Sequence, residues 1–135
     1  MLDRDFWAQQ RVFLTGQTGF KGSWASLWLS HLGATQHGLA LAPETTPSLY
    51  DLFGDLPGRE MSSIGDIRDQ DAVVRAVRDC DPTVAIHMAA QPLVRRSYRC
   101  PIETYASNVM GTVHVLEALR HAPNIKAVLI ITTDK

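Results

Sequence analysis

The sequence predicts an α/β protein built on a Rossmann-like, doubly wound parallel sheet. Short apolar, β-rich runs alternate along the chain with stretches of helical periodicity, a pattern typical of parallel βαβ units. A glycine-rich segment, residues 16–22, lies between the first strand-like run and the first helix-like stretch. We therefore expect five strands in the spatial order 3-2-1-4-5, with the sheet truncated after the fifth strand.

The predicted elements follow from apolar spacing and from turn residues. The expected strands are residues 11–15, 36–41, 61–65, 83–88 and 127–132, and the expected helices are residues 20–32, 68–80 and 101–120. Residues 42–59, which contain three prolines and two glycines, are expected to be irregular. In the first helix, Trp24 and Trp28 are expected to pack in the core with Leu27 and Leu32. In the second, Val73, Val74 and Val77 are spaced for one buried face.

Composition excludes several classes of protein. A net charge of −1 over 135 residues gives no basic footprint for nucleic acid or for an anionic membrane. No apolar run approaches the roughly 20 residues that cross a bilayer, and the N-terminus does not read as a secretory signal. Two cysteines, Cys80 and Cys100, do not make a disulfide framework, which favours a reducing, cytoplasmic location.

The glycine-rich segment carries the strongest chemical signal. Gly16 permits a tight turn, Gly19 permits close approach of a pyrophosphate, and Gly22 lets the following helix pack against the sheet. The free N–H groups and the positive dipole end of that helix would then face the phosphates. An ordinary turn is the alternative, but the position directly after a buried strand favours nucleotide binding.

The end of the second expected strand leaves the choice between NAD and NADP open. A carboxylate that binds the adenosine ribose is expected about 20 residues after the last glycine of the loop. Here the chain reads Leu41-Ala42-Pro43, and the first carboxylate is Glu44.

Five motifs, in this order along the chain, resemble the extended short-chain dehydrogenase/reductase superfamily. They are T-G-x-x-G-x-x-G at 15–22, G-D-I-R at 65–68, H-M-A-A-Q at 87–91, Y-x-x-N-x-x-G-T at 105–112 and T-T-D-K at 132–135. The last is similar to the catalytic strand end of nucleotide-sugar 4,6-dehydratases. Within that family, the longer strings G-F-K-G-S-W and A-A-Q-P-L-V-R-R-S-Y resemble the branch that acts on CDP-glucose.

The resemblance implies an NAD-binding domain over residues 1–135 and a set of cofactor-binding residues. These are Gly16, Thr18, Gly19, Phe20, Lys21, Gly22, Asp66, Ile67, Ala89, Ala90, Gln91, Asn108 and Thr132. Asp66 is expected to contact adenine, although an aspartate there could instead cap the following helix. Asn108 is expected to hydrogen-bond the backbone at a strand end rather than to be merely solvated. Arg95 and Arg96 are equally compatible with a pyrophosphate contact and with an exposed loop pair.

The histidines are read as structural residues rather than as ligands. The spacings of the five histidines match no common metal-ligand pattern, so no metal site is expected. His87, in the fourth expected strand, is expected to be a packed residue rather than an acid or base.

The resemblance also implies the reaction, the conversion of CDP-glucose to CDP-4-keto-6-deoxyglucose and water. Thr133 would hydrogen-bond the sugar C4 oxygen, and Asp134 would act as the general acid that protonates the departing C6 hydroxyl. Lys135 occupies the position where relatives place the carboxylate base for C5, and a lysine base there needs a lowered pKa. A frayed terminal ion pair is the alternative for the last two residues.

Two further expectations concern the length of the chain. It ends directly after the fifth strand pattern, before the Tyr-x-x-x-Lys dyad and the C-terminal nucleotide-sugar domain of the family, so the 135 residues alone are expected to be inactive. The resemblance implies a homo-oligomer that uses the helix at 101–120, and an uncovered apolar face and an open sheet edge would promote association. Another nucleotide-sugar dehydratase, an epimerase or a non-catalytic NAD-binding module are the alternative functions.

Overall fold

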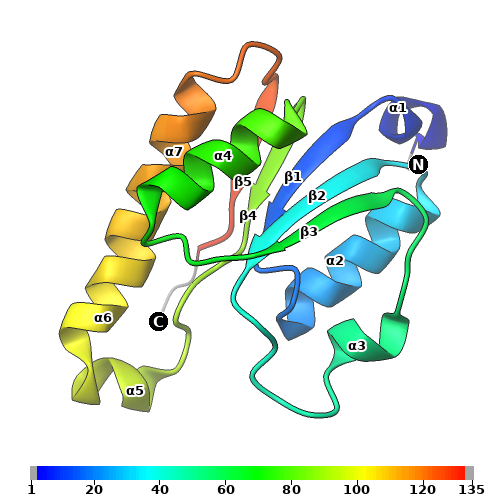
Figure 1. The fold of residues 1–135 in the computed structure, drawn as a ribbon. Coiled ribbons are helices and arrows are strands. Elements are labelled where there is room, and N and C mark those ends of the chain that lie inside the picture. The colour runs from blue at the N-terminus through cyan, green and yellow to red at the C-terminus, as the bar shows by residue number, and fades with distance from the viewer. Residues whose placement is uncertain (1–2, 133–135) are drawn as a thin grey trace.

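A five-stranded parallel sheet with helices on both faces forms the structure, a computed structural model that describes residues 3–132 (Figure 1). Its strands are β1 (Arg11–Thr15), β2 (Thr35–Ala40), β3 (Arg59–Ile64), β4 (Val84–His87) and β5 (Ala127–Ile130). They lie in the order β3-β2-β1-β4-β5, and every neighbouring pair is parallel. The predicted fold class and strand order are therefore confirmed.

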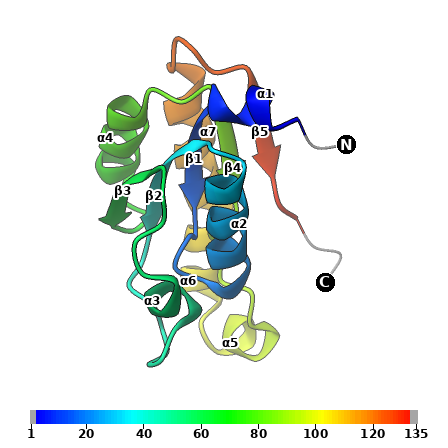
Figure 2. The same cartoon turned by 90° about the vertical axis from the view of Figure 1, so that its right-hand side faces the viewer.

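The helices form one layer on each face of the sheet. The helix α2 (Phe20–His31) covers one face, with the short helix α1 (Arg4–Ala8) near the start of β1 (Figure 2). The opposite face is covered by α4 (Gln70–Cys80) and by a continuous helical run of α6 (Pro101–Tyr105), η1 (Ala106–Met110) and α7 (Gly111–Arg120). Two short helices, α3 (Leu49–Phe53) and α5 (Val94–Arg99), lie beyond the strand ends.

The central strand β1 is buried on both faces, as its continuous apolar run predicts. Phe13 belongs to the core layer under α4 and α7, whereas Val12 and Leu14 belong to the layer under α2. Because side chains alternate along a strand, one short segment anchors both layers. This places the end of β1, where the glycine loop begins, at a rigid point in the fold.

The face that α2 presents to the sheet differs from the prediction. Trp24 and Trp28 are 50% and 54% exposed, so their assignment to the core was wrong. The buried residues of the helix are small for the most part: Gly22, Ser23, Ser26 and Leu29. Ser26 Oγ donates to Gln36 Oε1 on β2 at 2.8 Å, and Gln36 Nε2 donates to Ser26 O at 3.0 Å. Small residues let the helix axis approach the sheet closely, and bulky indoles are left on the outer face.

Other elements differ in detail. The buried face of α4 consists of Val73, Ala76, Val77 and Cys80, while Val74 is exposed. The long helix at 101–120 is present, but residues 106–110 take a π-helical hydrogen-bond pattern. The segment expected to be irregular contains α3, which Ser48 caps by accepting a hydrogen bond from Asp51 N. The Ser-x-x-Asp spacing was the available signal for this helix.

The cysteines are free, with Cys80 buried and Cys100 exposed. Burial raises the pKa of the Cys80 thiol to about 12, which keeps it in the unreactive protonated form at neutral pH. Among the described residues, no helix has both the length and the apolar character that a membrane crossing requires.

Candidate functional site

The candidate site lies at the edge of the sheet where the parallel strands end, here called the carboxyl edge. Loops that follow β1, β2, β3 and β4 meet there, together with the N-terminal end of α2 (Figure 1). In open α/β sheets, ligands bind in the crevice outside the carboxyl ends of the strands. Most of the cofactor-binding residues predicted from sequence lie on these loops.

The glycine loop is packed so tightly that two of its glycines leave no room for a side chain. Gly16 has φ +80°, and a Cβ there would lie 2.9 Å from the backbone nitrogen of Ala89. A Cβ on Gly22 would lie 2.6 Å from Gly16 C and 2.8 Å from Gln17 Cα. Gly19 is the extended N-cap residue of α2, with its N–H bonded to Gly16 O at 3.1 Å. The loop therefore turns tightly and packs directly against the segment that follows β4 and against the first turn of α2.

The N-terminal end of α2 is suited to an anion. The N–H groups of the first turn, which includes Phe20 and Lys21, have no partner within the helix. Gly19 provides no side-chain cap, and no acidic residue lies in that first turn. The positive dipole end and the exposed Lys21 ammonium group would both stabilise a phosphate.

The loop after β2 is joined to the glycine loop by a hydrogen bond. Thr18 Oγ1 donates to the carbonyl oxygen of Leu41 at 2.8 Å. This bond brings the predicted pyrophosphate loop beside the strand end where an adenosine ribose is usually recognised. The carboxylate of Glu44, the first acidic group after β2, lies 3.7 Å from the guanidinium group of Arg96 on α5.

Asp66 does not cap α4, so the capping alternative was wrong. The N-cap residue is Asp69, whose side chain accepts from Ala72 N. Asp66 accepts from Arg68 N at 2.8 Å and forms an ion pair with the Arg68 guanidinium group at 2.5 Å. The hydrogen bond from the Arg68 side chain lowers the pKa of Asp66, which therefore stays ionised at neutral pH.

Ile67 can offer little more than its backbone N–H to a ligand. Its side chain is buried in the core against Gly111 of α7, where a Cβ would lie 2.5 Å from Ile67 Cδ1. Its carbonyl oxygen lies 2.9 Å from His114 Nδ1. The predicted contact between Ile67 and the cofactor remains a prediction.

A buried chain of hydrogen bonds holds the end of β4. Thr112 Oγ1 donates to Asn108 O at 2.8 Å, so the Thr112 oxygen accepts from His87 Nε2 at 3.0 Å. His87 Nδ1 is then an acceptor, and Thr15 Oγ1 donates to it at 2.6 Å. The Thr15 oxygen in turn accepts the backbone N–H groups of residues 88 and 89, both at 3.1 Å.

This chain of bonds assigns His87 a neutral Nε2–H tautomer. The residue is 3% exposed, and burial lowers its pKa. Its ring nitrogens are both occupied by threonine hydroxyls, which confirms the expectation of a packed residue. Neither nitrogen is free to transfer a proton to a substrate.

Asn108 fastens the segment that follows β4, as the sequence analysis expected. Its Oδ1 accepts from Gln91 N at 2.7 Å, and its Nδ2 donates to Gln91 O at 3.0 Å. The Gln91 side chain is bonded to the backbone of Leu93 and to Thr104 Oγ1. Ala89 is half-buried and Ala90 is exposed, so the segment that leads from β4 to Gln91 is accessible at the carboxyl edge.

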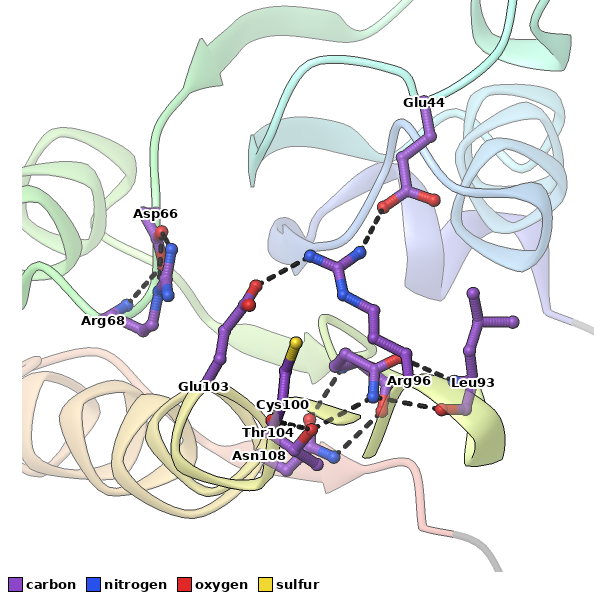
Figure 3. Close-up of polar contacts among 10 residues, drawn as sticks. Glu44, Asp66, Arg68, Leu93, Arg96, Cys100, Glu103, Thr104 and Asn108 are labelled. Atoms are coloured by element: carbon purple, nitrogen blue, oxygen red, sulfur yellow. Dashed lines mark hydrogen bonds and ion pairs between the residues drawn. The ribbon is translucent and has the colours of Figure 1, made fainter. Parts of the chain in front are cut away.

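Arg96 points across the carboxyl edge between two carboxylates. Its guanidinium group lies 2.7 Å from Glu103 on α6 and 3.7 Å from Glu44 in the loop after β2 (Figure 3). Arg95 is exposed. Both arginines lie on α5 rather than in a loop, so the loop-pair alternative was wrong in its placement. The pyrophosphate alternative would require Arg96 to exchange a carboxylate for a phosphate.

The predicted catalytic residues Thr133, Asp134 and Lys135 lie outside the described residues. Thr132, which follows β5, is exposed. Within residues 3–132, no three His, Cys, Asp or Glu side chains are grouped so that they could hold a metal ion.

Sequence reasoning missed the supporting residues Thr15, Gln17 and Thr112. Thr15 begins the motif T-G-x-x-G-x-x-G and Thr112 ends the motif Y-x-x-N-x-x-G-T, which was the available signal for both, whereas Gln17 occupies an unspecified position of the first motif. Thr15 and Gln17 are buried.

Comparisons with known proteins agree with this geometry. The sequence pattern of the GDP-mannose 4,6 dehydratase family matches residues 13–134. A CDP-glucose 4,6-dehydratase of Salmonella typhimurium is 53% identical over 135 residues, which is 100% of this chain and 37% of that relative. A UDP-glucose 4-epimerase of Thermus thermophilus, solved as a complex with NAD, is 31% identical with a TM-score of 0.73, over 87% of this chain and 36% of that one.

A further solved structure bears on the fold alone. An epimerase of Methanothermobacter thermautotrophicus has a TM-score of 0.80 at 22% identity, over 97% of this chain and 38% of that one. The chain thus spans well under half the length of these relatives.

Proposed function

The chain belongs to the GDP-mannose 4,6 dehydratase family, and we propose that it is the NAD-binding part of a nucleotide-sugar 4,6-dehydratase that acts on CDP-glucose. The observation that carries this proposal is the 53% identity to a CDP-glucose 4,6-dehydratase over the full chain. The tight glycine loop at the carboxyl edge supports the cofactor part of the proposal. Residues 1–135 would form an incomplete Rossmann domain, completed by later elements.

The residues at the carboxyl edge fit a dinucleotide. Side chains at Gly16 and Gly22 would collide with backbone, so these positions require glycine for the tight turn from β1 into α2, the arrangement in which dinucleotide-binding folds hold a pyrophosphate. Gly19 and the first turn of α2 would bind the phosphates, and Asp66 would reach the adenine ring. The backbone at Ala89, Ala90 and Gln91 would line the cofactor, with Asn108 holding it in place.

The chemistry then follows from what the bound cofactor supplies and what the chain supplies. NAD held by the glycine loop would supply reversible hydride transfer to the sugar. Thr133 would hydrogen-bond the C4 oxygen, and Asp134 would protonate the C6 hydroxyl as it leaves. Lys135 would take the C5 proton, which the C4 ketone acidifies, so that one water is lost across C5 and C6.

The test is turnover by the complete protein with CDP-glucose, dTDP-glucose and GDP-mannose, each followed by NMR detection of the 4-keto-6-deoxy product. We expect product from CDP-glucose, and an Asp134→Asn variant should lose most of it. Turnover of dTDP-glucose or GDP-mannose alone would reject the substrate, and a 4-epimer as product would favour an epimerase. NAD binding without turnover of any sugar would indicate a non-catalytic module.

Two finer points are part of the same proposal. Leu41, Ala42 and Pro43 supply no carboxylate after β2 that would select NAD over NADP. Titrations with NAD and NADP would establish the cofactor preference. A cytoplasmic location and a homo-oligomer remain predictions.

A further inference from the structure

One residue of the glycine loop has a side chain that the loop itself does not require. Gln17, the residue after Gly16, is only 1% exposed. Its side chain passes over Gly38 of β2, where a Cβ would lie 2.6 Å from Gln17 Nε2 and 2.7 Å from Gln17 Cγ. The absence of a side chain at position 38 therefore makes room for the amide of a loop residue 21 positions earlier.

The buried amide reaches two elements beyond the loop. Gln17 Nε2 donates to Ser62 Oγ on β3 at 3.2 Å. Ser62 Oγ lies 2.5 Å from the hydroxyl oxygen of Tyr50 on α3. The Arg59 guanidinium carbon lies 4.8 Å from the centroid of the Tyr50 ring, a cation–π contact that helps to hold the ring in place. The glycine loop is thereby connected to the segment that follows β2.

The other end of the amide is unsatisfied. Gln17 Oε1 is buried and, among the described residues, has no hydrogen-bond partner. A buried carbonyl without a partner is unfavourable, and an apolar side chain of similar size would avoid that cost. The stability of the folded protein alone therefore does not explain an amide at position 17. The hydrogen bond from Gln17 Nε2 to Ser62 does explain it.

The backbone of Gln17 is held as firmly as its side chain. Gln17 O accepts from Ser23 Oγ on α2 at 3.0 Å, and Ser23 is itself buried. Gln17 Cα packs against Gly22, at 2.8 Å from the place a Cβ would take. Gln17 thus lies between Gly16 and Gly19, where its orientation determines the path of the backbone that faces the ligand.

We propose that Gln17 is a positioning residue for the dinucleotide. Its side chain, seated over Gly38 and bonded to Ser62, holds the glycine loop in the conformation that binds the pyrophosphate. Through Ser62 it also ties that loop to Tyr50 and to the segment next to the adenosine ribose. This proposal rests on the proposed function, in which the loop binds NAD.

The interlock between Gln17 and Gly38 gives a sharp test. In the complete protein, calorimetric titration with NAD is compared for wild type, Gln17→Met, Gly38→Ala and the double variant Gln17→Ala/Gly38→Ala, with the exposed Gln70→Ala as a matched control. Methionine fills the space of the glutamine but removes the bond to Ser62, so Gln17→Met should weaken NAD binding about fivefold, the worth of one hydrogen bond. Gly38→Ala should weaken it more, since the methyl group displaces the amide.

The double variant separates an interlock from two independent defects. A methyl group at position 38 fits once the glutamine side chain is gone, so the double variant should bind NAD more tightly than Gly38→Ala alone. The KM for CDP-glucose should stay at the wild-type value in Gln17→Met, because the change affects the cofactor loop alone. A general loss of structure would raise the KM for CDP-glucose as well. Gln70→Ala should bind NAD as wild type does.

Each outcome decides the matter. Wild-type NAD affinity in Gln17→Met, or a double variant that binds NAD no more tightly than Gly38→Ala, would overturn the positioning role while leaving the proposed function intact. A wild-type protein that does not bind NAD would overturn both. If Gly38→Ala fails to fold, the comparison of Gln17→Met with wild type still decides.

Discussion

Replacing His87 with alanine tests the buried chain of hydrogen bonds that holds the end of β4. The change removes the acceptor of the Thr15 hydroxyl at 2.6 Å and the donor to Thr112 at 3.0 Å. A buried hydroxyl without a partner costs about 1–3 kcal/mol, and the space left by the imidazole adds a cavity term of similar size. We expect the free energy of unfolding to fall by about 3 kcal/mol.

The assay is urea unfolding of the complete protein at pH 7.5, with the exposed His121→Ala as control. A loss of about 3 kcal/mol lowers the urea midpoint by roughly 1 M for an m-value near 3 kcal/mol/M. His121 pairs with Glu117 on the surface, so its replacement should cost less than about 0.5 kcal/mol. Hydrogen exchange at the amides of residues 88 and 89 should accelerate in His87→Ala alone, because both bond to Thr15.

The pH dependence gives an independent readout of the same residue. Burial lowers the pKa of His87 in the folded state, below the 6.5 of an ordinary histidine. Below pH 6.5 the unfolded chain therefore binds a proton that the folded protein does not. The free energy of unfolding is highest above pH 6.5 and declines as the pH falls, by at most about 1.4 kcal/mol per pH unit. His87→Ala should lack this contribution. An unchanged slope, or a destabilisation no larger than that of His121→Ala, would refute the reasoning.

Three further changes probe the site and the outer surface. Gly22→Ala should weaken NAD binding at least tenfold by calorimetry, because its methyl group would lie 2.6 Å from Gly16 C, and wild-type affinity would contradict the tight loop. Asn108→Ala leaves both backbone groups of Gln91 without their partner. It should lower the free energy of unfolding in urea by about 1–3 kcal/mol and raise the KM for NAD, and equal stability would show that the two hydrogen bonds are dispensable. Tyr105→Glu places a charge in the apolar stripe, which is formed by the exposed apolar side chains of α6, η1 and α7. The change should lower the mass that light scattering measures at a given concentration, and an unchanged mass would exclude this face as the interface.

That apolar stripe bears on the expected association. The exposed apolar side chains along the helical run are Ile102, Tyr105, Val109, Met110, Val113 and Leu116. Apart from the adjacent pair Val109 and Met110, they recur every three or four residues, so they line one face of the run. The uncovered apolar face that the sequence analysis expected is therefore present, while association through it remains a prediction.

Much of the fold could be predicted because local signals are strong there. The apolar run of β1, the glycines of the loop and the alternation of strands and helices each depend on near neighbours in sequence. The expected order of the strands is the one that belongs to the doubly wound fold class. The same local signals placed Gly16, Gly19 and Gly22 at the start of α2, and the hydrogen bond from Asn108 followed from the family resemblance.

The tertiary structure decided which polar and aromatic residues are inside. Helical periodicity placed Trp24 in the core, but α2 packs on the sheet through its small-residue face, where Ser26 is hydrogen-bonded to Gln36. Periodicity records where apolar residues recur, and it does not measure how closely a helix can approach a sheet.

The sequence by itself determined a doubly wound sheet with a glycine loop at its carboxyl edge. Only the tertiary structure decided what supports that loop and the end of β4. Gln17 fits over Gly38, and His87 joins Thr15 to Thr112, residues that are 72 and 25 positions away from it. Each such contact depends on side chains that meet only after the strands have paired, so no spacing along the chain reveals them.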